Sequence, residues 1–321
     1  ILRLLSTPDD IFDNAYIYLL IIFLGIPFIL FYNLLAGIMR AVGDSRTPFI
    51  FLMISAFLNI FLDIMFIAVI RLGCAGAALA TVIAQAVSGI ACFIYIQKKY
   101  PLLRLKRQYC KFNFYAIKEL FIMGIPMGLQ YSITAIGSMV MQSANNGLGS
   151  SYVSGFTAAS KIKQLAMCPF DAIATGVSVF TSQNLGAGKP ERIRKGIFNG
   201  VAVGAGYGAV IGLVLIFFGR PLSLMFIKSS ETAVLAASAQ YLMCAGFFYW
   251  LLGILNTTRM TIQGLGYSAV AIFSGVIEMI ARIAVSKAFV PKFGFWAICF
   301  TDQAAWVLAT IYCSIVCAVC I

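Results

Sequence analysis

Charged residues are scarce in this sequence, and histidine is absent. Only 11% of the 321 residues are charged, 61% are apolar, and the mean hydropathy is +0.96. So few charges cannot cover the surface of a soluble globule of this length. The lack of histidine removes the commonest metal ligand, and the nine cysteines lie mostly in apolar segments, where we interpret them as small core residues. We therefore expect a membrane protein with no metal and no cofactor.

Apolar stretches long enough to cross a bilayer recur along the whole chain. A helix needs about 20 mostly apolar residues to span the hydrocarbon core. Nine segments meet this length and are separated by short polar or basic stretches, which predicts an all-α membrane protein. The predicted spans are 16–40, 48–70, 75–96, 121–142, 153–183, 197–218, 234–263, 269–290 and 296–320.

The excess of basic residues follows the order of the loops. The formal charge is +12, and thirteen of the 23 Lys and Arg residues lie at 40–46, 98–118 and 189–195. These stretches alternate with loops that carry few basic residues, which is the positive-inside pattern. The pattern places the three basic stretches in the cytoplasm and gives no reason to expect a nucleic-acid partner.

The two parts of the sequence resemble each other. Aligning residues 31–45 with 254–268 pairs Asn33 with Asn256, Gly43 with Gly266 and Ser45 with Ser268. Helix order and loop charge agree as well, which favours parallel repeats related by an axis along the membrane normal. We predict the remainder of an N-terminal lobe at 1–97, a basic cytoplasmic loop between the lobes at 98–118, and a C-terminal lobe at 119–321.

The first residue is Ile1, and the opening segment is typical of a helix already under way. The repeat therefore predicts that the chain is truncated and that the first lobe lacks its opening helices.

Several short motifs resemble the multidrug and toxic compound extrusion (MATE) family of transporters. In the first lobe they are Arg40-Ala-Val-Gly-Asp-Ser-Arg-Thr-Pro48 and Gly73-Cys-Ala-Gly-Ala-Ala-Leu-Ala-Thr81; the second lobe has Gly124-Ile-Pro126 and Glu278 followed by Arg282. Their order and spacing cover essentially the whole chain. The motif residues of both lobes are Gly43, Asp44, Pro48, Gln183, Asn184, Gly186, Gly188, Gln263, Gly264 and Gly266.

The resemblance implies twelve helices in two six-helix lobes, of which nine are visible here. It implies a monomeric, multi-pass protein of the plasma or inner membrane, and no enzyme. Such a protein would export organic cations or amphipathic, drug-like compounds in exchange for protons or sodium by alternating access between the lobes.

Acidic and basic residues within spans are candidates for ion coupling, because a charge at membrane depth is costly. Glu278 and Arg282 stand four residues apart on one helix face, where they can neutralise each other. Function and a purely structural ion pair remain equally open for them. Asp171 is a further candidate, ranked above Asp302, and it could pair with Lys161 or Lys163.

Candidates for the substrate cavity are neutral polar, aromatic and methionine side chains within spans: Asn33, Gln130, Met139, Gln142, Tyr249 and Asn256. Some sodium-coupled MATE proteins have carboxylates in their seventh and tenth helices, and this chain has none in the corresponding spans. Proton-coupled relatives have an aspartate in the first helix, which lies outside this sequence. The coupling ion therefore stays open.

Two other functions compete with drug export. A lipid-linked oligosaccharide flippase of the same superfamily would need basic residues at depth, for which Lys161, Lys163 and Arg282 are candidates. An intramembrane enzyme is more remote, because Asp44 lies in a predicted cytoplasmic loop and no second acid is placed near it to share acid–base chemistry.

Overall fold

A computed structural model describes residues 9–104 and 112–320. Within these ranges nine long α-helices follow one another, and all nine are long and apolar enough to span a membrane. They are α1 (Asp9–Ala41), α2 (Arg46–Asp63), α3 (Gly73–Lys99), α4 (Phe114–Asn146), α5 (Ser150–Gly186), α6 (Pro190–Ser223), α7 (Thr232–Gly264), α8 (Ser268–Phe293) and α9 (Phe295–Cys320). The predicted all-helical membrane architecture is confirmed.

The helices form two compact units, Ile1–Phe112 and Asn113–Ile321. The first contains α1 to α3, and α2 runs on into a π-helix, η1 (Ile64–Val69). A short 3-10 helix, η2 (Pro101–Leu103), follows α3. The side chains of Tyr32, Met39 and Cys92 form the core where α1 packs against α3.

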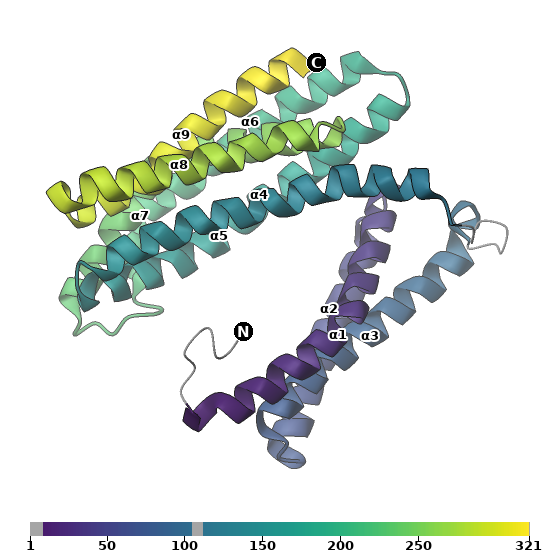
Figure 1. The fold of residues 1–321 in the computed structure, drawn as a ribbon, viewed down its shortest axis with the longest axis horizontal. Coiled ribbons are helices and arrows are strands. Elements are labelled where there is room, and N and C mark those ends of the chain that lie inside the picture. The colour runs from purple at the N-terminus through teal and green to yellow at the C-terminus, as the bar shows by residue number, and fades with distance from the viewer. Residues whose placement is uncertain (1–8, 105–111, 321) are drawn as a thin grey trace. The chain divides into compact units, whose positions relative to one another are not determined.

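The second unit contains α4 to α9, which Figure 1 shows as a bundle of long helices, with α8 and α9 side by side. Its core includes the fully buried side chains of Tyr241, Leu242 and Tyr249 from α7. Of all the spans, α7 has the largest buried share, at 56% of its most apolar window. Helix α7 is therefore the centre around which the cavity described below is built.

Large apolar side chains on the outer faces of the helices are exposed. Leu24, Phe57 and Phe217 are between 66% and 72% exposed, and Val319 is 81% exposed. A soluble domain rarely leaves apolar surface uncovered on this scale. These faces fit the hydrocarbon of a bilayer, as the composition predicts.

The repeat predicted from the sequence recurs in the backbone. Gly43 follows α1 with a φ of 90°, and Gly266 follows α7 with a φ of 93°. Next to them, the Asp44 amide donates to the Met39 carbonyl, and the Tyr267 amide donates to the Ile262 carbonyl. The same helix-ending turn thus occurs at equivalent positions of the two units, in agreement with two related lobes.

Candidate functional site

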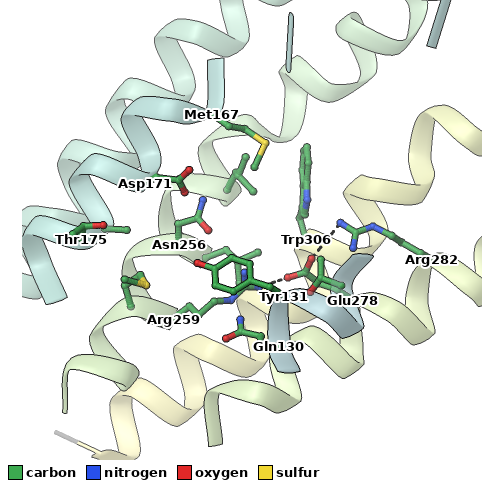
Figure 2. A pocket seen from close by; sticks show the side chains of 15 residues that line it. Gln130, Tyr131, Met167, Asp171, Thr175, Asn256, Arg259, Glu278, Arg282 and Trp306 are labelled. Atoms are coloured by element: carbon green, nitrogen blue, oxygen red, sulfur yellow. Dashed lines mark hydrogen bonds and ion pairs between the residues drawn. The ribbon is translucent and has the colours of Figure 1, made fainter. Parts of the chain in front are cut away.

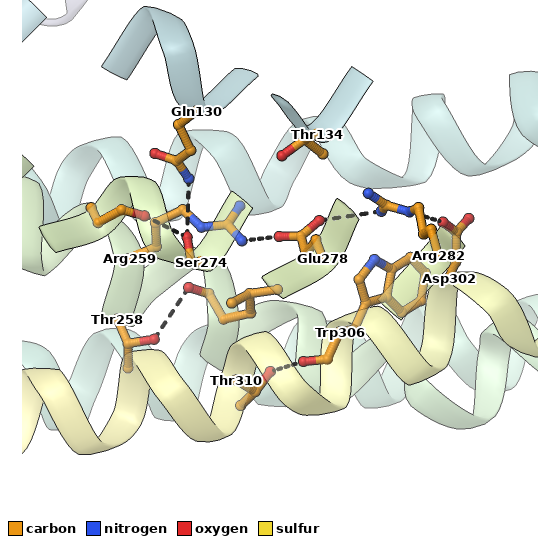
Figure 3. Close-up of polar contacts among 12 residues, drawn as sticks. Gln130, Thr134, Thr258, Arg259, Ser274, Glu278, Arg282, Asp302, Trp306 and Thr310 are labelled. Atoms are coloured by element: carbon orange, nitrogen blue, oxygen red, sulfur yellow. Dashed lines mark hydrogen bonds and ion pairs between the residues drawn. The ribbon is translucent and has the colours of Figure 1, made fainter. Parts of the chain in front are cut away.

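A chain of buried ion pairs runs through the second unit (Figure 3). At one end, the Arg259 guanidinium on α7 pairs with the Glu278 carboxylate on α8. The other Glu278 oxygen lies 3.2 Å from Nη2 of Arg282, one helical turn further along α8. Glu278 is 3% exposed, so this carboxylate is held between two guanidinium groups with almost no access to bulk solvent. The predicted pairing of Glu278 with Arg282 is present.

The other end of the chain is Asp302, on α9. Its Oδ1 accepts a hydrogen bond from Nε of Arg282 at 2.9 Å. Its Oδ2 accepts one from Nζ of Lys163, on α5, and one from the Tyr241 hydroxyl, on α7, each at 2.6 Å. One carboxylate therefore ties together α5, α7, α8 and α9.

These contacts follow from the cost of burying charge. An ionised side chain away from water must find an opposite charge or several hydrogen bonds. Lys163, Arg259, Arg282, Glu278 and Asp302 all lie on membrane-spanning helices and pair with one another. We call these five residues the ion-pair chain.

The ion-pair chain borders a cavity of about 430 Å³ that lies wholly within the second unit. Side chains from α4, α5, α7, α8 and α9 line it, and Figure 2 shows them from close by. Its polar lining consists of Gln130, Tyr131, Thr134, Asp171, Thr175, Asn256, Arg259, Glu278, Arg282 and Trp306. Met167, Leu252 and Leu255 are among its apolar neighbours. A concave site of this volume with a few converging polar groups is typical of small-molecule binding.

Helix α4 is tied to the cavity by neutral amides. The Gln263 side chain on α7 donates to Oε1 of Gln130 at 2.8 Å. Gln130 in turn donates to the Ser274 hydroxyl on α8 at 3.2 Å. Contacts between polar side chains are a common way to hold helices together in a membrane.

The structure brings all three predicted coupling residues to one cavity, since Glu278, Arg282 and Asp171 all line it. Asp171 is exposed, and no ion pair joins it to another described residue within 4.0 Å. Lys163 pairs with Asp302 instead, and Lys161 lies over the ring of Phe226. The pairing of Asp171 with Lys161 or Lys163, which the sequence left open, is absent from the described ion pairs.

The six predicted cavity residues are spread more widely. Gln130 and Asn256 line the cavity. Tyr249 is fully buried in the core next to it and donates to the Lys163 carbonyl. Met139 is 71% exposed, and Gln142 donates to Asn146 near the end of α4. Asn33 belongs to the first unit, where its amide donates to the Ile29 carbonyl of its own helix.

The motif residues of the first unit close the turn between α1 and α2. Asp44 accepts hydrogen bonds from the Thr47 amide at 3.0 Å and the Thr47 hydroxyl at 2.6 Å, and from the Tyr100 hydroxyl at 2.5 Å. Together these bonds lower the pKa of Asp44 to about 2, and its carboxylate raises the pKa of Tyr100 to about 12. The Tyr32 hydroxyl donates to the carbonyl of Pro48. Asp44 therefore acts as the cap of α2.

The motif residues of the second unit likewise lie at helix ends. Helix α5 includes Gln183 and Asn184 and ends at Gly186, and Gly188 turns the chain with a φ of 65°. Gly264, at the end of α7, is so close to Ser178 of α5 that a Cβ there would lie 2.7 Å from the Ser178 carbonyl oxygen. These glycines shape helix ends and a helix contact.

Sequence reasoning missed much of the site. Arg259, Tyr241 and Trp306 were not selected, Asp302 was ranked below Asp171, and Lys163 was considered only as a partner of Asp171 and for the flippase. A usable signal was present, because each charged residue inside an apolar span needs a partner of opposite sign. Which helices supply the partners depends on packing, and the sequence of one chain does not contain that information directly.

A bundle of membrane-spanning helices around a charged cavity defines the class as a helical multi-pass membrane protein. The MatE family model matches residues 1–65 and 126–287, which is more than half of the chain. The chain therefore belongs to the MatE family, as its motifs predict, and like the family's transporters it is not an enzyme.

Individual relatives agree with this assignment. The chain is 32% identical over 297 residues to the probable multidrug resistance protein YpnP of Bacillus subtilis, covering 92% of this chain and 65% of YpnP. It is 23% identical over 265 residues to the probable multidrug resistance protein NorM of Thermotoga maritima, covering 81% of this chain and 56% of that protein. The chain thus spans less than two thirds of the length of these relatives.

Solved structures show the same fold. An outward-facing multidrug resistance MATE family transporter superposes with a TM-score of 0.90 at 19% identity, covering 100% of this chain and 73% of that one. The MATE transporter VcmN of Vibrio cholerae in its bent form superposes with a TM-score of 0.89 at 22% identity, covering 99% and 72%.

Proposed function

We propose that this protein is a secondary active exporter of drug-like organic cations or amphipathic compounds, working as a monomer in the plasma membrane by alternating access. The observation that carries the proposal is the charged cavity of about 430 Å³ inside membrane-spanning helices. Ionisable groups at such depth are costly and are functional candidates by default. The names of the relatives, which are multidrug resistance and export proteins, support the same activity.

Asp171 is the group in the cavity best suited to bind a cation. Its carboxylate faces the cavity without an ion pair to another described residue. An organic cation, a proton or a sodium ion would compete for the same negative charge. Such competition makes the release of one cation depend on the arrival of another, which is the requirement for exchange.

Glu278 links the cavity to helix packing. Its negative charge is shared by Arg259 and Arg282, which would repel each other if that charge were removed. Uptake of a proton by Glu278 would therefore loosen the contact between α7 and α8. Loosening that depends on protonation is one physical route from ion entry to a rearrangement of helices.

The test is efflux of ethidium from cells that express the complete protein. We expect the normal protein to lower cellular fluorescence, and Asp171→Asn and Glu278→Gln to abolish this effect at unchanged expression. Lys161→Gln is the matched control, because it removes a charge from α5 at a position that does not line the cavity. Unchanged export by Glu278→Gln would end the role proposed for that residue, and absence of export by the normal protein would contradict the function itself.

The coupling ion can be identified in vesicles that contain the purified complete protein. Dye movement would be followed after imposing either a proton gradient or a sodium gradient. Transport driven by the proton gradient alone is consistent with uptake of a proton by Glu278 or by Asp171. Transport driven by sodium alone would rule out the role proposed for Glu278 and leave Asp171 as the ion site.

A flippase of lipid-linked oligosaccharides is the alternative, and the three basic residues of the ion-pair chain are what favour it. Most of their charge is neutralised, however, because Glu278 and Asp302 hold Arg259, Arg282 and Lys163 in ion pairs. A diphosphate would have to compete with these carboxylates. Binding of a lipid diphosphate together with failure to export any cationic dye would favour the flippase.

A further inference from the structure

A second concave surface of the second unit is an apolar groove between α8 and α9, with a volume of about 370 Å³. Alanines of α9, Ala297 and Ala304, lie in it beside much larger side chains. Those larger side chains are four aromatic residues: Phe289, Phe293, Trp296 and Phe300. A flexible hydrocarbon chain that fills such a groove gains dispersion contacts along its whole length.

The aromatic side chains of the groove are held in place by contacts between rings. Phe289 and Phe293 stack with their ring centroids 6.2 Å apart and their planes at 23°. Phe300 meets the ring of Phe248, on α7, edge to face at a centroid distance of 6.5 Å. The four aromatic residues of the groove are nevertheless between 43% and 60% exposed. An exposed apolar surface of fixed shape is suited to an apolar partner.

The groove lies where a phospholipid would enter it in the right direction. It starts near Gly294, which separates α8 from α9, and from Phe293 to Val285 it follows about 12 Å of α8 at 1.5 Å per residue. Trp296 is the second residue of α9, and tryptophan is typical of the level of the lipid headgroups. The groove therefore leads from the headgroup region into the hydrocarbon, as an acyl chain does.

Lys292, in the last turn of α8, supplies a positive charge at the headgroup end. Its side chain is exposed and joins none of the ion pairs in the described ranges. Lys292 follows Phe289 by three residues and Val285 by seven, a spacing that places the three on one face of the helix. By the positive-inside pattern this end of α8 faces outside, where basic residues are few, so topology does not account for the lysine. An anionic headgroup is the complementary partner.

We propose that the groove between α8 and α9 binds an anionic phospholipid of the outer leaflet, with an acyl chain along the aromatic side chains and the negative headgroup at Lys292. A zwitterionic phospholipid would fill the same groove and bring no net charge to Lys292. The inference goes beyond the proposed function and does not depend on export, because binding is measured without transport.

The bound lipid would also support the contact between α8 and α9. Val285 is one helical turn from Arg282, and Ala304 is two residues from Asp302. The groove thus reaches the part of both helices where Arg282 pairs with Asp302. A ligand that binds there in the folded state alone raises the stability of the protein.

Quenching of tryptophan fluorescence by brominated lipids tests the site in the purified complete protein, reconstituted in vesicles of phosphatidylcholine. The probes are phosphatidylglycerol and phosphatidylcholine with the same brominated acyl chains. The signal of Trp296 is the difference between the unmodified protein and Trp296→Phe. We expect phosphatidylglycerol to quench it at a mole fraction about fivefold lower, a factor that corresponds to the attraction of one lysine to an anionic headgroup.

Two outcomes of this experiment would overturn the proposal. Equal quenching by the two lipids would mean that the groove does not select an anionic headgroup. Quenching of Trp296 by neither lipid would mean that protein, such as a second copy of the chain, covers the groove.

Variants of two lysines then locate the headgroup. Lys292→Gln should abolish the preference for phosphatidylglycerol. Lys287→Gln is the matched control, because Lys287 is an exposed lysine of the same helix that lies two residues from Phe289, a spacing at which side chains do not share a face. It should leave the preference unchanged. A preference that survives in Lys292→Gln would contradict the assignment of the headgroup to Lys292.

A bulkier residue in the groove separates a binding site from an effect of charge alone. Ala304→Leu fills part of the groove and keeps Lys292, so the preference should decrease. Ala288→Leu makes the same change at an exposed position of α8 outside the groove and should have no effect. An unchanged preference in Ala304→Leu would mean that the groove takes no part in binding.

Thermal unfolding in detergent provides a readout without tryptophan. Added phosphatidylglycerol should raise the melting temperature of the unmodified protein and of Lys287→Gln more than phosphatidylcholine does. Lys292→Gln should show no difference between the two lipids. An equal rise with both lipids in the unmodified protein would count against the site.

Discussion

Among the single residues, Asp302 is the one on which we expect the stability of the second unit to depend most. Its carboxylate is 1% exposed and accepts hydrogen bonds from Lys163, Tyr241 and Arg282. Removing one partner of a buried ion pair leaves the other charges uncompensated and costs about 3–5 kcal/mol. Asp302 is therefore a residue on which the packing of four helices depends.

We expect Asp302→Asn to destabilise the purified protein by about 3–5 kcal/mol, because Lys163 and Arg282 would lose their shared anion. Thermal unfolding in detergent measures the loss. The double variant with Lys163→Gln should be less destabilised than the sum of the two single variants, since it removes both members of one pair. Additive effects would mean that the two side chains do not interact.

Asp44 should remain ionised at a pH at which most aspartates are protonated. Its pKa is lowered from 3.8 to about 2 by hydrogen bonds from Thr47 and Tyr100. A carboxylate whose pKa is lower in the folded state stabilises the fold above its unfolded pKa, and this contribution is lost as the pH falls through the folded value. The stabilisation that Asp44 provides at the start of α2 is thus complete above a pH of about 4 and decreases towards pH 2.

Tyr100→Phe tests the hydrogen bond between the Tyr100 hydroxyl and the Asp44 carboxylate. The variant loses the hydrogen bond to Asp44, which should lower stability at neutral pH by up to about 1 kcal/mol at this partly exposed site. The difference from the unmodified protein should shrink as the pH falls from 4 to 2. Tyr115→Phe is the control, since this tyrosine is 71% exposed. A difference in stability that does not change over this pH range would rule out the contact with ionised Asp44.

At the scale of helices, α6 and α7 approach each other closely. A Cβ on Gly208 would lie 2.5 Å from the Tyr249 carbonyl oxygen and 2.7 Å from the Trp250 Cα. A Cβ on Gly253, on the facing helix, would lie 2.3 Å from the backbone of Gly204. Small residues let helix backbones approach closely in membranes, where packing replaces the hydrophobic effect.

Gly208→Ala should therefore separate α6 from α7 and destabilise the protein by about 1–3 kcal/mol, as overpacking commonly does. Gly206→Ala is a matched control on the same helix, because nothing lies within 4 Å of its added Cβ. That control should be neutral or slightly stabilising, since alanine favours helix more than glycine. Equal melting temperatures of the two variants would contradict the close contact.

The sequence predicted the helices better than their ends. Runs of apolar residues predicted the nine spans found between residues 9–104 and 112–320, because length and hydropathy are local properties. The span predicted at 121–142 belongs to α4, which extends from Phe114 to Asn146. Asn113 caps this helix by accepting from the Tyr115 and Ala116 amides, a signal outside the apolar run. The π-helix Ile64–Val69 has no such sequence signal and was missed.

The ion pairs of the site were predictable only where the two paired residues are close in sequence. Glu278 and Arg282 are one turn apart, so their pairing follows from helix geometry. Lys163 and Asp302 are 139 residues apart in the sequence, and only the packing of the bundle brings them together. Asp171, predicted as a candidate for ion coupling, lines the cavity, and no described ion pair joins it to a lysine of its own helix.

For the whole molecule, the distribution of basic residues predicts the side of the membrane on which each turn lies. The turn at 42–45 should be cytoplasmic, and the turn at 70–72 before α3 should face outside. This arrangement can be tested without a further structure.

A variant that retains Cys74 as its only cysteine should react in intact cells with a thiol reagent that cannot cross membranes. Cys74 is exposed and follows the turn at 70–72. Ser45→Cys in a cysteine-free protein should react only after the membrane is opened. Labelling of Ser45→Cys in intact cells would reverse the predicted orientation.

The matched turns at Gly43 and Gly266 bear on the ancestry of the protein. Two copies of a duplicated gene accumulate different substitutions, and most apolar positions in these helices can exchange one apolar residue for another. A residue with a φ near 90° cannot change so freely, because any side chain strains a left-handed backbone. If the two units descend from one copied sequence, we expect these two glycines to be retained where the apolar residues around them have changed.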